Sequence, residues 1–154
     1  MRKVNEDYIG YWQPESDAER LERGAIAVVA DGVGGQGNGE VASKMAIESA
    51  IATFQRMNPV NAPRQILKQI FDTSNLEIYE AGMDSPRGGR MATTLSVCIF
   101  RDKELFIGHV GDTRVYLVRR ENIRRLTDDH SYTAMQVKLR LISEHEAKAS
   151  RLRS

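Results

Sequence analysis

The chain has 154 residues, and its 22 lysines and arginines nearly balance its 21 aspartates and glutamates. That length suits one domain with its own hydrophobic core, and the balanced charge argues against bulk binding of nucleic acid or of a membrane surface. No apolar stretch approaches the roughly 20 residues of a membrane span, and polar residues rather than a signal-peptide core follow Met1, so we expect a cytoplasmic protein.

The first half of the chain predicts a strand followed by two helices. Ala25–Ala30 is a short, fully apolar strand candidate. From Glu40 to about Met57, alanines and large apolar residues indicate a mostly buried helix. A second helix is expected from Asn61, a plausible N-cap with Pro63 in the first turn, to Gly82, a typical stop.

Strands dominate the next part of the sequence. Four apolar runs separated by short turns predict an antiparallel meander: Thr93–Phe100, Leu105–Val110, Val115–Val118 and Ile123–Leu126. The residues from Ser131 onward are expected to be helical again, with a solvated charged face. Together these elements predict an α+β fold in which the two long helices pack as an antiparallel pair on one face of the sheet. The single cysteine, Cys98, is expected to be an inert core thiol in a reducing compartment.

Carboxylates recur where predicted strands end. Asp31 follows the strand Ala25–Ala30 and opens a glycine-rich run that ends at Gly39. A loop of this kind puts a hard oxygen ligand where the backbone can approach a metal or an anion. Glu6 and Asp7 lie upstream, and Asp112 follows the run Leu105–Val110. The pattern suggests a cation site between packed strands.

Five motifs, in order, carry a family resemblance: Arg2-x-x-Asn5-Glu6-Asp7, Val28-Val29-Ala30-Asp31-Gly32-Val33-Gly34-Gly35, Thr93-Thr94-Leu95, Gly108-x-Val110-Gly111-Asp112-Thr113-Arg114 and Leu126-Thr127-x-Asp129-His130-Ser131. Singly, an Asp-Gly-x-Gly-Gly run is a weak signal. The five together cover almost the whole chain, which resembles the bacterial protein phosphatase 2C-like family of metal-dependent serine/threonine phosphatases.

The resemblance implies a β-sandwich of antiparallel strands flanked by helix pairs, with a binuclear Mn²⁺ or Mg²⁺ site at one end. Its implied chemistry is hydrolysis of a phosphate monoester by a metal-activated water, with a phosphorylated serine/threonine protein, a kinase or a kinase substrate, as partner. The implied site residues are Asp31 bridging the two ions, the Gly32 carbonyl, Glu6 and Asp7 on the second ion, Asp112 on a third, weaker ion, and Arg2 on the substrate phosphate. His130 is expected to be structural.

The sequence also departs from the family pattern. Family members carry a strand before the first motif and further metal-binding aspartates, in Ser-Asp-Gly and Asp-Asn motifs, in their last third. Neither motif follows Ser131. We therefore expect residues 1–154 to form a single phosphatase 2C-like domain that is truncated at the C-terminus and lacks the first strand.

Two other readings stay open at this point. The chain could be a non-catalytic phosphatase-like module that binds a phosphoprotein or a regulatory partner through the same cleft. It could also be an unrelated α+β module whose glycine loop cradles a phosphate, although a Walker-type loop is excluded because no Gly-Lys-Ser/Thr follows Gly39.

Overall fold

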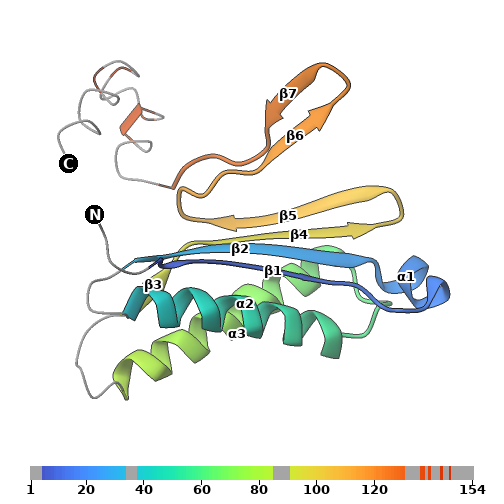
Figure 1. The fold of residues 1–154 in the computed structure, drawn as a ribbon, viewed down its shortest axis with the longest axis horizontal. Helices are drawn as coiled ribbons and strands as arrows, with labels where there is room; N and C mark the ends of the chain where they lie inside the picture. Colours follow the sequence, from blue (N-terminus) through green and yellow to red (C-terminus); the bar gives the residue numbers. More distant parts are fainter. Residues whose placement is uncertain are drawn as a thin grey trace. The chain divides into compact units, whose positions relative to one another are not determined.

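The computed structural model describes residues 5–33, 38–84 and 91–130, together with residues 136, 137, 139, 143 and 146. The chain divides into two compact units, residues 1–109 and residues 110–154, and Figure 1 labels their helices and strands. Within the described residues, helices accompany antiparallel strands, so the predicted α+β class is confirmed. None of the described helices combines the length and the apolar character that crossing a membrane requires.

The first unit is built on one sheet with the strand order β1-β2-β4-β5, in which β3 also pairs with β2. Its strands are β1 (Asp7–Trp12), β2 (Ala25–Val33), β3 (Ala92–Thr93), β4 (Leu95–Arg101) and β5 (Glu104–Val110). The central strand β2 is antiparallel to β1, β3 and β4. Strands β4 and β5 are joined by Asp102 and Lys103, both at positive φ, as in a tight two-residue hairpin turn.

Two long helices, α2 (Asn38–Arg56) and α3 (Pro63–Met83), cover one face of this sheet. Figure 1 shows them on the same side of the strands, running in opposite directions, which confirms the predicted antiparallel pair. The side chains of β2 alternate: Ile26, Val28 and Ala30 are buried against the helices, and their neighbours lie on the opposite, open face.

Several predicted boundaries are wrong. Strand β2 continues to Val33, so Asp31 lies inside the strand instead of opening the loop. Helix α3 has Ala62, not Asn61, as its N-cap, without a side-chain cap bond, because Pro63 takes the first helical position. Gly82 lies inside α3, which ends one residue later.

Two elements were missing from the sequence prediction. Strand β1 pairs with β2 along its whole length. Helix α1 (Asp17–Arg23) follows it; the Ser16 side chain caps its first turn by accepting a hydrogen bond from the Glu19 N–H at 3.2 Å. The helix ends at Gly24, whose φ of 82° lies in the left-handed region that glycine tolerates.

Two arginines hold the connection between α2 and α3. The Arg23 guanidinium donates to the carbonyl oxygens of Phe54, Gln55 and Met57, at 3.0, 3.1 and 2.7 Å. Arg101 donates to two further carbonyls in the same connection, those of Pro59 and Asn61. The Arg23 bonds satisfy acceptors at the C-terminus of α2, where a positive charge is also favourable.

The second unit contains a β-hairpin of β6 (Tyr116–Arg119) and β7 (Asn122–Arg125). Arg114 precedes the hairpin and forms a two-pronged ion pair with Asp129, with N–O distances of 2.9 and 2.7 Å. These bonds raise the pKa of the Arg114 guanidinium above its usual value. Most of the predicted C-terminal helix lies outside the described residues.

Candidate functional site

The candidate site lies where β1 begins and β2 ends. In the antiparallel register Asp7 faces Asp31 directly, and side chains of directly opposed residues project from the same face of a sheet with Cβ atoms about 5 Å apart. Because Ala30 and Gly32 on either side of Asp31 are buried, Asp31 and Asp7 lie on the open face. The structure therefore brings together two carboxylates that are 24 positions apart in the sequence.

Glu6 lies on the other side of the same strand end. The Gly32 N–H donates to the Glu6 carbonyl oxygen at 2.9 Å, which extends the β1–β2 pairing by one position. The Glu6 side chain points toward α2, because a Cβ on Gly39 would lie 2.8 Å from its Oε1 atom. Glu6 and Asp7, treated as one pair in the sequence analysis, thus serve opposite faces of the sheet.

Gly32 and Gly39 bring β2 and the start of α2 into direct backbone contact. A Cβ on Gly32 would collide with the Gly39 carbonyl group, and a Cβ on Gly39 would lie 3.0 Å from the Gly32 carbonyl carbon. The glycines were expected to let the backbone approach a metal or an anion; at Gly32 and Gly39 the close approach in the structure is between strand and helix. Gly34 and Gly35 lie outside the described residues.

Two threonines fix the main chain of Asp31. The Asp31 N–H donates to Thr94 Oγ1 at 2.9 Å, and the Thr94 N–H donates to the Asp31 carbonyl oxygen at 2.8 Å. Thr93 Oγ1 also donates to that carbonyl oxygen, at 3.0 Å. The Thr-Thr motif carried no predicted role of its own. The structure assigns it the positioning of the strand that carries Asp31.

The donor set has the chemistry of a hard divalent cation site. Carboxylate oxygens suit Mg²⁺ and Mn²⁺, and two carboxylates in direct opposition on neighbouring strands repel unless a positive charge offsets them. Among the described residues, however, no group of three or more His, Cys, Asp or Glu side chains is arranged to hold a metal ion. Asp7 and Asp31 thus fit part of a metal site.

The remaining predicted residues have different outcomes. Arg2 lies outside the described residues. Asp112 is exposed and belongs to the second unit. His109, a residue with no predicted role in the site, lies in β5, and its Nδ1 is 2.9 Å from the hydroxyl of the buried Ser96 on β4. Cys98 is half-buried and lies outside the hydrophobic core that its neighbours Val97 and Ile99 join, so its predicted core position is wrong; burial nevertheless raises the pKa of its thiol.

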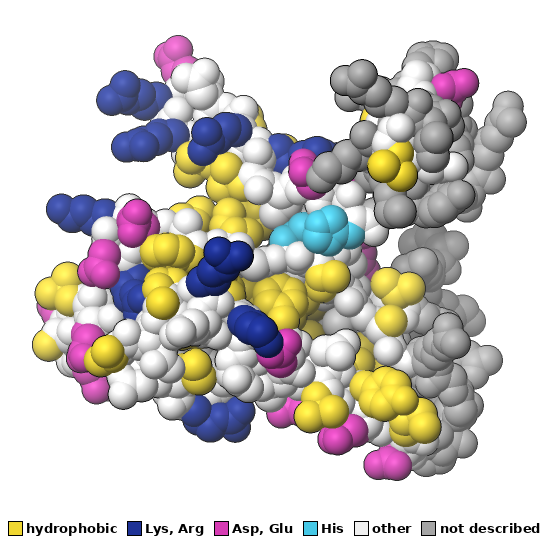
Figure 2. Space-filling view, turned by 180° about the vertical axis from the view of Figure 1, so that it is seen from behind, with side chains coloured by type: hydrophobic (Ala, Val, Ile, Leu, Met, Phe, Trp, Pro, Cys, Tyr) yellow, Lys and Arg dark blue, Asp and Glu magenta, His cyan; other side chains and the backbone are white. Residues whose placement is uncertain are grey.

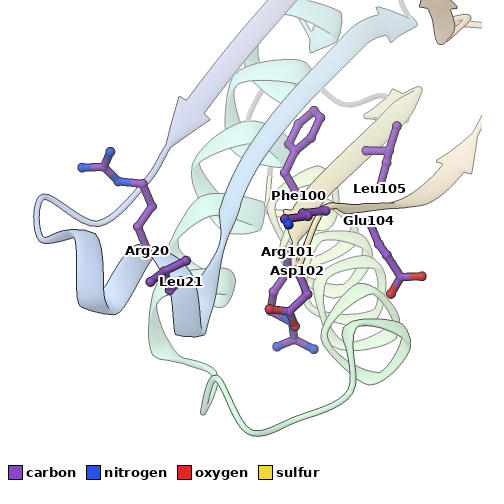
Figure 3. Close-up of a pocket in the computed structure, with 8 residues that line it drawn as sticks. Arg20, Leu21, Phe100, Arg101, Asp102, Glu104 and Leu105 are labelled. Carbon is purple, nitrogen blue, oxygen red and sulfur yellow. The ribbon is translucent and has the colours of Figure 1, made fainter.

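A hollow in the first unit lies near the opposite end of β2 from Asp31, between α1 and the β4–β5 turn (Figure 3). Leu21, Phe100 and Leu105 contribute apolar surface to it. Two arginines also line it, but both donate to main-chain carbonyls: Arg101 to the connection between α2 and α3, and Arg20 to the carbonyls of Pro14 and Glu15. These bonds hold loops in place. The carboxylates of Asp102 and Glu104, at the β4–β5 turn, also line the hollow.

The sequence of the chain is similar to those of known proteins. The profile of the family described as protein phosphatase 2C matches residues 3–154. The chain is 31% identical over 150 residues to the protein phosphatase PhpP of Streptococcus pneumoniae, covering 96% of this chain and 58% of PhpP. It is 31% identical over 153 residues to the serine/threonine phosphatase stp of Listeria innocua, covering 96% of this chain and 57% of that protein. The chain thus spans less than two thirds of these relatives.

Solved structures agree with this result. The serine/threonine phosphatase Stp1 of Staphylococcus aureus matches with a TM-score of 0.81 at 26% identity, over 94% of this chain and 56% of Stp1. The catalytic domain of the serine/threonine phosphatase PstP, solved with two manganese ions, matches with a TM-score of 0.76 at 26% identity, over 96% of this chain and 59% of that domain. The chain belongs to the protein phosphatase 2C family.

Proposed function

We propose that the chain is part of a metal-dependent phosphatase that removes phosphate from serine and threonine side chains of proteins. The observation that carries the proposal is the direct opposition of Asp7 and Asp31 at one end of the sheet. The manganese ions of the PstP catalytic domain and the phosphatase names of the relatives support the same chemistry. We propose two Mn²⁺ or Mg²⁺ ions at this end, with a weaker third ion at Asp112.

The position of each residue suggests a different role in metal binding. Asp31 would bridge the two ions. Thr94 holds the main chain of Asp31 through a hydrogen bond and so helps to position the carboxylate. Asp7 would share an ion with Asp31 from the neighbouring strand. Glu6 lies on the helix side and would contact an ion through a bound water. The carbonyl of Gly32 is a further proposed ligand. Bound divalent ions supply a hydroxide-like water at neutral pH and neutralise the phosphoryl oxygens.

The substrate side of the proposal rests on Arg2. A guanidinium presents a planar fork of donors that matches two phosphate oxygens, so Arg2 would orient the phosphoryl group without taking part in proton transfer. A kinase or a kinase substrate as the phosphorylated partner, and a cytoplasmic location, stay predictions.

Manganese binding and turnover test the proposal. Because few carboxylates are available, the chain alone should bind Mn²⁺ weakly in a calorimetric titration and hydrolyse p-nitrophenyl phosphate poorly. A chimera that joins the chain to the C-terminal remainder of PhpP should turn over. In that chimera Asp31→Asn should abolish hydrolysis, since the bridging position loses its charge and keeps its shape, and Arg2→Ala should mainly raise KM.

Asp72→Asn is the matched control and should leave turnover unchanged. It removes a carboxylate from the exposed surface of α3, where Asp72 pairs only with Lys68 among the described residues. A folded chimera that is inactive with Mn²⁺, or an Asp31→Asn variant with unchanged rate, would contradict the phosphatase assignment. The alternative of a non-catalytic module that binds phosphoproteins would then take its place.

A further inference from the structure

The β6–β7 hairpin has two chemically different faces. Its register pairs Tyr116 with Arg125 and Val118 with Ile123 on one face, and Leu117 with Arg124 and Arg119 with Asn122 on the other. Opposed residues share a face, so the first face is largely apolar and the second is basic. The apolar side chains Val118 and Ile123 are both exposed in this structure.

The basic face is hollowed. Leu117, Arg119, Arg120, Asn122 and Arg124 line one groove within the hairpin. Arg120 and Glu121 join the two strands, and Arg120, at a positive φ of 55°, completes a set of three guanidinium groups around the groove. Figure 2 shows a group of Lys and Arg side chains gathered over the hairpin, at upper left in that view.

These three arginines differ from the two others near them. Arg114 and Arg125 have carboxylate partners, Asp129 for the first and Asp128 and Asp129 for the second. Among the ion pairs formed between described residues, none involves the three arginines of the groove. Like charges placed close together on a hairpin lower its stability. The hairpin therefore carries a local excess of positive charge that pairing within the described structure does not offset.

We propose that this groove docks an acidic peptide segment of a partner protein. Guanidinium groups bind carboxylates and phosphates through paired hydrogen bonds, so aspartate, glutamate and phosphoserine share the chemistry that the groove recognises. The groove also presents the Leu117 side chain and the Asn122 amide, which suit the side chains and carbonyls of a peptide. This interaction is separate from the proposed hydrolysis and does not depend on it.

The dimensions and charge of the groove favour a peptide over nucleic acid. Each strand of the hairpin has four residues, about 13 Å at roughly 3.3 Å per residue, which matches a few residues of an extended peptide. Nucleic acids gain affinity by neutralising many phosphates along their length, and the formal net charge of the chain is only +1, which gives no long-range attraction of that kind.

Fluorescence anisotropy of labelled peptides, without added metal, tests the proposal on the whole chain. A glutamate-rich peptide and a phosphoserine-containing peptide are compared with a glutamine-rich peptide of equal length, a DNA oligonucleotide and vesicles of anionic lipid. We expect the two acidic peptides to bind and the glutamine-rich peptide to bind at least about tenfold more weakly, because hydrogen bonds to charged groups are the strong ones. The ratio of the two acidic affinities distinguishes carboxylate from phosphate as the preferred group.

The double variant Arg119→Ala/Arg124→Ala should lose about tenfold or more in affinity for the acidic peptides, and the charge-preserving double variant Arg119→Lys/Arg124→Lys should lose less. The control Arg64→Ala/Lys68→Ala removes two exposed positive charges from α3 and should leave binding unchanged, and circular dichroism shows that each variant is folded. The proposal is overturned if the acidic peptides do not bind, if the control variant weakens binding equally, or if DNA or vesicles bind more tightly than either peptide.

Discussion

The Asp31 end of the sheet and the β6–β7 hairpin both present charged side chains, but they hold them in opposite ways. Asp31 lies between two buried residues of the central strand, and its main chain is bonded to Thr94 on both sides. Arg119 and Arg124 lie on an exposed two-stranded hairpin. A metal site needs ligands held within a fraction of an ångström, whereas a peptide surface gains from side chains that adapt. The difference in support thus matches the difference in the proposed ligands.

The largest expected effect is a difference in Mn²⁺ affinity between variants of Asp7 and Glu6. If the open face binds the ion, Asp7→Ala removes one of the two opposed carboxylates and should weaken Mn²⁺ binding by about a hundredfold, since even outer partners of metal ligands cost about 10- to 100-fold. Glu6→Ala, on the helix side, should cost only a few-fold. Calorimetric titration measures both affinities. Equal losses would show that the two faces of the strand do not act separately.

The next effect concerns the backbone contact beneath the site. Gly32→Ala should lower the free energy of unfolding by about 2 kcal/mol, because the new Cβ collides with the Gly39 carbonyl group and forces α2 away. Gly82→Ala is the matched control: its Cβ would meet Met91 at 3.5 Å, an ordinary contact, and alanine should stabilise the helix by about 0.5–1 kcal/mol. Urea denaturation gives both values. Opposite signs are expected, and a neutral Gly32→Ala would contradict the close approach.

A smaller effect on stability tests the hydrogen bond between Thr94 and the main chain of Asp31. Thr94→Val keeps the shape of the side chain but removes the acceptor for the Asp31 N–H, so stability should fall by about 1 kcal/mol. Thr94→Ser retains the hydroxyl and should recover most of the Mn²⁺ affinity that Thr94→Val loses. If Thr94→Val lowers stability and leaves Mn²⁺ affinity intact, the threonine supports the sheet without positioning the carboxylate.

The smallest effect belongs to the second unit. Arg114→Lys replaces a two-pronged contact with Asp129 by a single point charge. Because the Arg114 side chain is 37% exposed and therefore screened by solvent, the loss should be about 0.5 kcal/mol. The difference from the unmodified chain should shrink in 1 M salt. A loss that salt does not change would mean that packing, rather than charge, makes the contact important.

Periodicity predicted the long elements well and the short ones poorly. Helices α2 and α3 bury broad apolar faces, which sequence spacing reveals. Strand β1 escaped detection because Gly10 interrupts its apolar run and most of its side chains are exposed, so little alternation is visible. Helix α1 buries no residue and depends on its Ser16 cap.

The sequence proposed residues for the candidate site but did not predict their geometry. The motifs identified Asp31, Asp7 and Glu6, yet the faces on which they lie depend on the register with β2. The bond between Asp31 and Thr94 joins positions 63 residues apart, and no local pattern encodes such a contact. Register and side chain–main chain bonds are products of tertiary packing, so they emerged only with the structure.

The arginine bonds at the far end of the sheet also bear on how the first unit opens. Arg23 of α1 bonds the end of α2 and Met57, and Arg101 of β4 bonds Pro59 and Asn61 just before α3, so the two helices are tied down at neighbouring points of one short connection. In native-state hydrogen exchange, the two helices should therefore behave as one cooperative unit with a shared opening free energy.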